Sequence, residues 1–262
     1  MKGYFMSKLP FMQYSTYTAV ALSLALTGCS SKKVPLKGER ERVFVQTSEV
    51  HADPEVRNLV IELPAAEQNT NWFQAGGERD HSMSSVQLGN GLKKVWSKSI
   101  GSGSGSARKL LSQPIIANGI IYAVDANSTV TAVNEASGKE IWSIKAGPKG
   151  RSVDSIGGGI GYWGEHVYVT TAYAEVLCLD AKSGKELWRK TTNSPVRAAP
   201  MIENNRVFVV NISNQLQVFN ATTGEPLWSH IGLSESSGVV GGSPVALSND
   251  IVVVPYSSGQ VY

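Results

Sequence analysis

From about residue 72 onward, short apolar runs alternate with turn-forming residues. The first group of runs reads "QPIIANG", "IIYAVDA" and "TVTAVN", and "GKEIWSIKA" follows it. β-branched and aromatic residues favour strands, whereas the glycine, asparagine, aspartate and serine between the runs favour tight turns. No 3.6-residue periodicity persists in this part of the chain. The pattern therefore predicts an all-β fold of short antiparallel strands.

This strand pattern repeats along the chain. The phrases "SGKEIW", "SGKELW" and "TGEPLW" end at Trp142, Trp188 and Trp228, and a looser phrase ends at Trp96. Successive tryptophans are separated by 46, 46 and 40 residues. Four strand-like runs fill each interval, and four-stranded antiparallel sheets at this spacing are typical of the blades of a β-propeller.

Each phrase also predicts a turn and a packing role. An Asn or Asp eight residues before the tryptophan can bond a turning backbone, and a Gly four residues before it suits a positive φ. Blades fan out around an axis, so the gap between them widens and a large flat ring can fill it. A small residue ten positions earlier leaves room for that ring. We predict four such wedges between blades: Trp96, Trp142, Trp188 and Trp228.

The chain has two cysteines, Cys29 and Cys178. Cys178 occupies the position that Ala132 fills one unit earlier, so we interpret it as a small buried core residue. A reactive or ligating thiol is the alternative. If Cys29 is acylated, Cys178 has no partner for a disulfide.

The N-terminus has the shape of a secretory signal. Lys2 and Lys8 precede the apolar stretch "TAVALSLALTG", which ends at Cys29. "LTGC" resembles the bacterial lipobox, in which the cysteine is acylated after cleavage. Ser30 in place of Asp implies, by the same resemblance, sorting to the outer membrane. We expect a signal peptide at 1–28, a lipid-anchored tether at 29–70 and an incomplete propeller domain at 71–262.

Composition narrows the possible chemistry. The net charge is +3, and two of the lysines that contribute to it lie in the N-terminal leader. The remaining basic residues do not cluster on one face, so nucleic-acid binding has little support. The four histidines are dispersed without HExxH or paired cysteines, so no metal site is expected. "GSGSGS" at 101–106 lacks phosphate-loop spacing. Three carboxylates are candidates for lining a central channel: Asp125, Asp154 and Glu175.

Several segments together resemble the BamB-type outer-membrane assembly lipoproteins, which are propellers of PQQ-type repeats. These segments are "LTGCSS", "KGERERVFV", "NWFQAGGERDHSMSS" and "LKKVWSKSIGSGS". The resemblance implies a non-catalytic scaffold without a cofactor, anchored on the periplasmic face of the outer membrane. Its implied partners are the POTRA domains of BamA, other subunits of the β-barrel assembly machinery, and nascent outer-membrane proteins.

The same resemblance implies a contact loop. In the family pattern an apolar residue, an Arg and soon a Pro end one loop, and "NSPVRAAP" places Val196 and Arg197 there. We predict Arg197 as a polar anchor at the partner surface and Val196 as its apolar neighbour; an internally paired arginine is the alternative. A second family loop carries two acidic residues, where this chain has Val239 and Gly241.

The family propeller has eight blades, and we expect about half of them here. The chain stops at Val261-Tyr262, twelve residues short of the next expected tryptophan, so we expect a C-terminally truncated form. Two other functions stay open. One is a fragment of a PQQ-dependent quinoprotein dehydrogenase, although those enzymes use calcium, a catalytic Asp and often adjacent cysteines. The other is a lipid-anchored propeller that binds another periplasmic partner.

Overall fold

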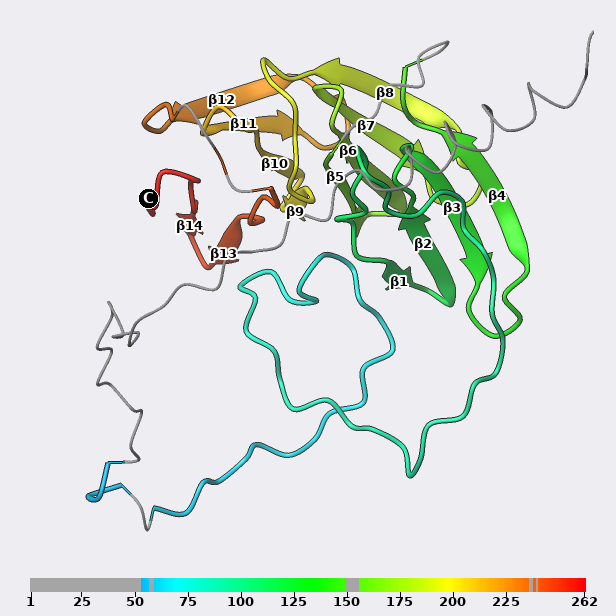
Figure 1. Ribbon diagram of the computed structural model, residues 1–262, viewed down its shortest axis with the longest axis vertical. Helices are drawn as coiled ribbons and strands as arrows, with labels where there is room; N and C mark the ends of the chain where they lie inside the picture. Colours follow the sequence, from blue (N-terminus) through cyan, green and yellow to red (C-terminus); the bar gives the residue numbers. More distant parts are fainter. Residues whose placement is uncertain (1–52, 57–58, 149–155, 236–237, 239) are drawn as a thin grey trace, which may run out of the picture. The chain divides into compact units, whose positions relative to one another are not determined.

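The computed structural model describes residues 53–56, 59–148, 156–235, 238 and 240–262 (Figure 1). The chain divides into two compact units, Met1–Val60 and Ile61–Tyr262. In the first unit, Asp53 begins a turn in which its carboxylate accepts a bond from the amide of Glu55 (2.9 Å). The expected signal peptide, 1–28, and the acylation site, Cys29, lie outside the described residues.

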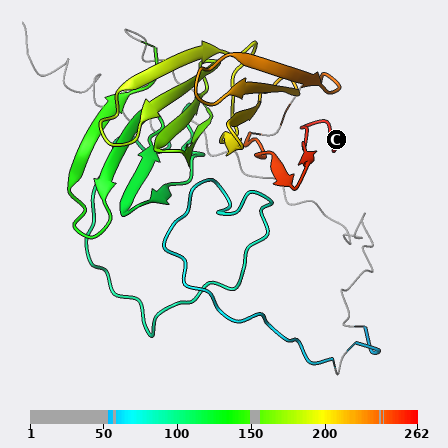
Figure 2. The ribbon, with the colours of Figure 1, turned by 180° about the vertical axis from the view of Figure 1, so that it is seen from behind.

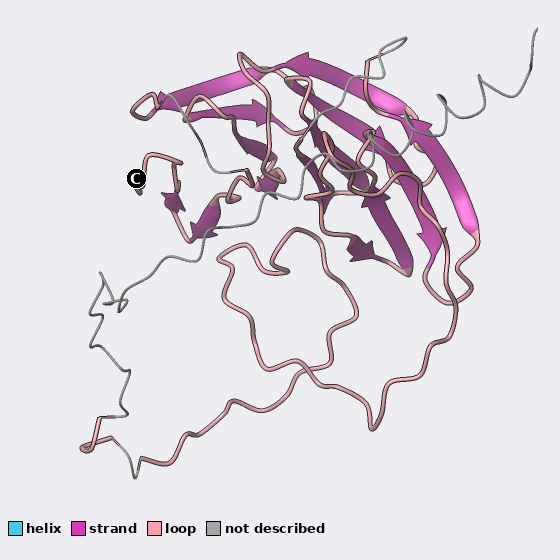
Figure 3. Ribbon diagram, in the orientation of Figure 1, coloured by secondary structure: helices cyan, strands magenta, loops and turns pink. Residues whose placement is uncertain are grey.

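The second unit is built from fourteen short strands and loops, and the described residues contain no helix (Figure 3). The all-β prediction is thus confirmed, and no described helix could span a membrane. The strands are β1 Ile115–Ala117, β2 Ile120–Val124, β3 Thr129–Asn134, β4 Glu140–Lys145, β5 Gly158–Trp163, β6 His166–Thr171, β7 Glu175–Asp180, β8 Glu186–Thr191, β9 Met201–Glu203, β10 Arg206–Val210, β11 Gln215–Asn220, β12 Pro226–Ile231, β13 Ala246–Ser248 and β14 Ile251–Val253.

The strands form three antiparallel four-stranded sheets, β1–β4, β5–β8 and β9–β12, followed by the hairpin β13–β14. Neighbouring sheets follow chain order and share three apolar cores. The first core joins sheets one and two, the second joins sheets two and three, and the third joins sheet three to the hairpin. Within this unit the sheets fan out with β4, β8 and β12 on the outside (Figures 1 and 2). This is the predicted propeller architecture.

The repeated phrase forms the same turn in each sheet, as its composition predicted. Eight residues before each tryptophan stands an Asn or Asp. Its side-chain oxygen accepts a hydrogen bond from the backbone amide of the Ser or Thr that lies three residues later. The glycine that follows has a positive φ, which disfavours any residue with a Cβ. The three acceptor–donor pairs are Asn134–Ser137 (2.9 Å), Asp180–Ser183 (2.8 Å) and Asn220–Thr223 (3.0 Å), and the φ angles are 68° at Gly138, 71° at Gly184 and 73° at Gly224.

Each tryptophan except Trp228 docks on the turn of the following sheet. The indole of Trp142 donates a hydrogen bond to the carbonyl of Ala181 (2.9 Å) and lies flat on Gly184. A Cβ on that glycine would come within 2.7 Å of the ring, so only glycine fits. Trp228 meets no such turn among the described residues and is 45% exposed. The same contacts are made by Trp188 with Ala221 and Gly224, and by Trp96 with Glu135 and Gly138.

A small or medium-sized apolar residue pairs with each of Trp142, Trp188 and Trp228, and Cys178 is one of these residues. Cys178 pairs across the strands with Trp188 on one side and Tyr168 on the other. It is 1% exposed and free, which confirms the prediction of a buried core residue. Burial in this apolar surrounding raises the pKa of the Cys178 thiol to about 12.

Cys178 is therefore expected to resist alkylation in the folded protein. With a pKa of about 12, only about one thiol in a thousand is ionised at pH 9, where half of the unfolded thiols are ionised. Iodoacetamide at pH 9 should label Cys178 at least 100-fold more slowly in buffer than in 6 M urea, measured by peptide mass spectrometry. Equal rates would show that the thiol is accessible.

The pKa of the Cys178 thiol is higher in the folded than in the unfolded protein. The contribution of this thiol to stability therefore falls as the pH rises from about 9 to about 12.

A segment before the first sheet crosses the inner strands. We name residues Asn71–His81 the hub strap. It forms bonds with the first strand of each sheet and with the hairpin, so it ties together four elements that are distant in sequence. Its contacts are Trp72 with Ile116 of β1 (2.7 and 2.9 Å), the carbonyl of Phe73 with the amide of Tyr162 of β5 (2.8 Å), the guanidinium of Arg79 with Glu203 of β9 (2.9 Å), and the carbonyl of Arg79 with the amide of Leu247 of β13 (2.7 Å).

Candidate functional site

The predicted contact loop lies between β8 and β9, and its valine points inward. Val196 is fully buried in the core between the second and third sheets. Its backbone forms an isolated bridge with Asn211, and its amide donates to the carbonyl of Thr171 (3.3 Å). The side chain offers no surface to a partner in this structure. The expected apolar contact by Val196 therefore needs correction, because the packing of the two sheets takes up that side chain.

Arg197, the next residue, lines a groove. The groove has a volume of about 490 Å³ and lies between the end of β10 and the segments on both sides of the β13–β14 hairpin. Arg197 is half-buried and lines the groove, and its role as a polar anchor stays a prediction. Arg197 and Glu235 are the charged residues of the lining. The other lining residues are Val210, Asn211, Ile212, Ser213, Asn214, Ser234, Gly238, Gly241, Gly242, Ser243, Pro255, Tyr256 and Ser257.

Two buried asparagines give the groove a fixed floor. The Asn214 carboxamide oxygen accepts bonds from the amide and the hydroxyl of Ser257 (3.0 and 2.8 Å), and its nitrogen donates to the carbonyl of Leu233 (2.7 Å). Asn211 accepts a bond from the amide of Ser213 (3.0 Å). Neither asparagine was predicted as a site residue from the sequence. Their signal was the turn "NISN", which joins two strands with an asparagine at each end.

The second family loop reaches the same groove. Gly241 lines it, while Val239 lies outside the described residues. At Gly242 a Cβ would come within 2.8 Å of the amide nitrogen of Ala198, so the two loops touch next to Arg197. The structure thus brings together two loops that are more than forty residues apart in sequence. The second loop contributes backbone and glycines here rather than acidic side chains.

The three candidate carboxylates do not form a common site. Asp125 is 6% exposed and accepts backbone bonds from Ser102 (2.8 Å) and Asn127 (2.8 Å), so it organises a turn. Asp154 lies outside the described residues. Glu175 accepts a bond from Arg189 (2.8 Å), and Asp125 and Glu175 therefore both serve local structure.

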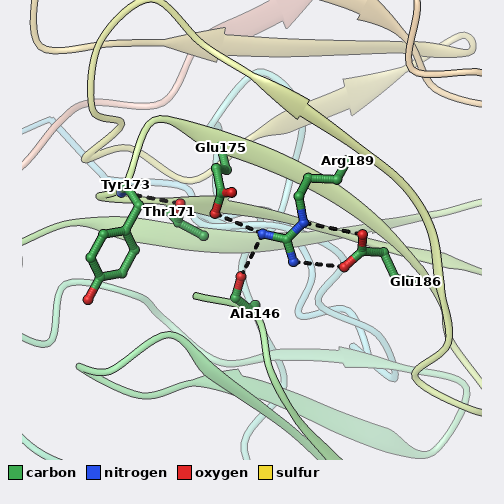
Figure 4. Close-up of polar contacts among 6 residues, drawn as sticks. All are labelled: Ala146, Thr171, Tyr173, Glu175, Glu186 and Arg189. Carbon is green, nitrogen blue, oxygen red and sulfur yellow. Dashed lines mark hydrogen bonds and ion pairs between the residues drawn. The ribbon is translucent and has the colours of Figure 1, made fainter. Parts of the chain in front are cut away.

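Arg189 is the centre of a polar cluster between the first and second sheets (Figure 4). Its guanidinium binds both oxygens of Glu186 (3.2 and 2.7 Å), one oxygen of Glu175 and the carbonyl of Ala146 (3.0 Å). These bonds raise the pKa of Arg189 above its already high value, the pair with Glu186 contributing most. All of its nitrogens are engaged, so the cluster joins two sheets and offers no free charge to a substrate.

The described residues do not match the donors that a calcium-dependent quinone cofactor requires. No group of three or more His, Cys, Asp or Glu side chains within 53–56, 59–148, 156–235, 238 and 240–262 could hold a metal ion. Cys178 is the single cysteine in these ranges, so adjacent cysteines are absent from them. No catalytic step through such a cofactor follows from this part of the chain.

Comparison with known proteins finds one repeat family in two functional settings. Uncharacterized protein RC0314 of Rickettsia conorii is 34% identical over 154 residues, which cover 58% of this chain and 37% of that protein. Outer membrane protein assembly factor BamB of Salmonella typhimurium is 33% identical over 114 residues, covering 42% and 29%. The crystal structure of quinohemoprotein alcohol dehydrogenase from Comamonas testosteroni is 23% identical and superposes with a TM-score of 0.53 over 63% of this chain and 28% of that one.

The structural match shows the propeller fold alone. The chain spans less than half the length of these relatives. A family model described as outer membrane protein assembly factor BamB matches residues 45–143 and 126–262. Because these matches cover most of the chain, the protein belongs to the PQQ-repeat family described as outer membrane protein assembly factor BamB.

Proposed function

We propose that this protein is a non-catalytic, lipid-anchored scaffold of the machinery that inserts β-barrel proteins into the outer membrane. In this proposal Cys29 carries the lipid, and the sheets face the periplasm. The groove at Arg197 binds the POTRA domains of BamA. Other subunits and nascent outer-membrane proteins are the further partners.

The observation that carries the proposal is the groove itself. It combines an arginine, a tyrosine and fixed asparagines, and arginine and tyrosine are among the residues that most often dominate the energy of protein interfaces. Two loops that the family resemblance singles out both line it. Arg197 and Tyr256 both line the groove, so a partner there can gain a charge-assisted bond from the one and ring contact from the other.

Arg197→Glu is expected to abolish partner recovery. The change replaces the one positive charge of the groove by a second negative charge beside that of Glu235, and an acidic partner group would then meet repulsion. We expect at least a tenfold drop in the BamA that co-purifies with the full-length protein from solubilised outer membranes, measured by quantitative immunoblot. Arg206→Glu is the matched control, because Arg206 is exposed on β10 outside the groove lining. Undiminished recovery with Arg197→Glu, or equal losses in both variants, would contradict the proposal.

A quinoprotein dehydrogenase fragment is the second candidate, because Quinohemoprotein alcohol dehydrogenase ADH IIB of Pseudomonas putida shares 30% identity over 139 residues. The two candidates differ in a simple assay. PQQ and calcium are added to the purified full-length protein, and dye-linked oxidation of alcohols or sugars is measured. We expect no turnover above the protein-free control, whereas sustained turnover would favour the enzyme.

A further inference from the structure

A second groove lies where the hub strap meets the ends of β5 and β9, and the proposed scaffold role does not use it. Its volume is about 320 Å³, near the lower end of the roughly 300–1,000 Å³ that small-molecule sites occupy. It shares no lining residue with the groove at Arg197. We name it the strap groove, and its lining comes from residues within 68–79, from Tyr162 and Trp163 of β5, and from Ile202 and Glu203 of β9.

Gln74 of the hub strap lines this groove without a hydrogen-bond partner for its side chain. The residue is 7% exposed, and its carboxamide bonds no group in the part of the chain that the structure describes. A carboxamide can both donate and accept, and leaving these bonds unmade in a buried place is costly. Among the described residues, Gln217 Oε1 is the one side-chain oxygen or nitrogen that is both sealed from solvent and unpartnered. The Gln74 carboxamide therefore keeps an opening, and the strap groove accounts for it.

The backbone on both sides of this carboxamide is fixed. The carbonyl of Phe73 accepts a bond from the amide of Tyr162 (2.8 Å), and the carbonyl of Gln74 accepts one from the amide of Gly77 (2.9 Å). The asparagines in the other groove differ, because Asn214 uses both ends of its carboxamide within the protein. Gln74 is thus held in place with its polar groups unused, which lowers the ordering cost of binding a ligand.

Aromatic rings line the same groove. Phe73 stacks on Tyr162 with the ring centroids 5.5 Å apart and the planes at 18°, yet Phe73 remains 40% exposed. Tyr162 is fixed in turn, because the side chain of Asn118 donates to its hydroxyl oxygen (3.0 Å). Open ring surface therefore accompanies the unused carboxamide. A sugar fits this combination, since the C–H face of its ring packs on an aromatic ring while its hydroxyl groups both donate and accept.

The rest of the lining favours a neutral ligand that is rich in hydroxyl groups. The run "QNTN" at 68–71 supplies three carboxamides and a hydroxyl. Arg79 is paired with Glu203 (2.9 Å), and Glu78 adds a further carboxylate, so negative charge exceeds positive charge and anions are disfavoured. The strap also bonds to the backbone of β5 here, so a peptide cannot add to that point as another strand.

We propose that the strap groove binds a neutral saccharide, with two vicinal hydroxyl groups on the carboxamide of Gln74 and a ring face against Phe73. One hydroxyl donates to the carboxamide oxygen and its neighbour accepts from the carboxamide nitrogen. The ligand thereby meets both polar groups that the protein leaves unmet. This binding is separate from the scaffold role, because it uses a different groove.

A glycan array tests the proposal with the purified full-length protein in a detergent that has no sugar headgroup. The array carries neutral hexose and N-acetylhexosamine oligosaccharides, their sulfated counterparts, and neutral extended peptides. We expect saturable binding to a neutral series at least tenfold above its sulfated counterpart, because the lining has excess negative charge. Either neutral series supports the proposal and identifies the saccharide. Binding to no neutral saccharide, or a preference for the sulfated saccharides or the peptides, overturns it.

Gln74→Met tests the carboxamide itself. The variant keeps the length of the side chain but removes both polar groups, so we expect the best array ligand to bind at least tenfold more weakly by calorimetry. The melting temperature should stay the same or rise, since the carboxamide has no protein partner to lose. Gln217→Met is the matched control, because Gln217 lies on β11 outside both grooves and also has an unpartnered oxygen. Undiminished binding by Gln74→Met, or equal losses in both variants, overturns the proposal.

Phe73→Leu keeps the test decisive if Gln74→Met does not fold. It leaves an apolar side chain but removes the ring, and we expect at least fivefold weaker binding of the same ligand. Binding as tight as that of the unaltered protein overturns the proposal. None of these measurements involves BamA, so a failure here is distinct from a failure of the scaffold role.

Discussion

Replacing Trp142 with alanine is expected to lower the free energy of unfolding by about 3–5 kcal/mol. The ring is 9% exposed, packs against Tyr122 (centroids 5.9 Å apart) and covers Gly184 of the next sheet. Its removal leaves a cavity between two sheets and takes one of two donors from the carbonyl of Ala181, which then keeps only the hydroxyl of Tyr122 (3.2 Å). Urea unfolding followed by far-UV circular dichroism measures the change.

Trp228→Ala is the matched control for this prediction. Trp228 has the same place in its phrase, but it is 45% exposed and covers no glycine turn among the described residues. We expect the free energy of unfolding to fall by about 1 kcal/mol or less, because the ring of Trp228 is not packed between two sheets. Similar losses in the two variants would mean that the ring stabilises its own sheet rather than the junction between sheets.

The fold could be predicted from sequence because the sheets repeat. Each repeat has the same turn residues, the same strand-forming residues and a tryptophan at the same place. The structure predicted from one phrase, such as "SGKELW", is therefore supported by the equivalent phrases before and after it. Gly184 illustrates this. A positive φ at one glycine would be a weak prediction, but the same glycine in three phrases indicates a fixed turn, and the structure confirms all three.

In the contact loop the structure separates two neighbouring residues that were predicted to act together. Val196 and Arg197 were both expected at a partner surface, yet consecutive side chains of an extended segment point to opposite sides. Val196 forms a bridge with Asn211 and is buried, whereas Arg197 reaches the groove. The alternation was visible in "PVRAAP", but which side faces the core depended on how the second and third sheets pack.

The hub strap could not be predicted for a different reason. Its contacts join Phe73 to Tyr162 and Arg79 to Glu203 across 89 and 124 residues, without a repeat to mark them. The role of Asp125 in a turn could not be predicted either, and it was expected in a central channel. Its backbone partner Ser102 lies in a loop that has no counterpart in the repeated tryptophan phrase. Long-range contacts made once leave no periodic signal in a single sequence.

The glycines at the start of β5 have two separate roles in the structure. At Gly158, φ is 97°, so this residue provides a bend. Gly159 does not need a positive φ. A Cβ at Gly159 would lie 2.4 Å from the Cα of Ala199 and 2.9 Å from its nitrogen, so the backbone before β9 passes directly over β5.

Gly159→Val is therefore expected to cost about 2–4 kcal/mol of stability through overpacking between the second and third sheets. Backbone, unlike a flexible side chain, cannot move aside without separating β5 from β9, and the groove that Arg197 lines rests on the same junction. Urea unfolding by circular dichroism measures the loss. Gly103→Val is the control, because Gly103 has no neighbour within 4 Å of its Cβ position and no positive φ, and we expect a change within about 0.5 kcal/mol. If both variants unfold alike, the close approach of the two backbones is not a constraint, and a β-propensity effect of valine would explain the result instead.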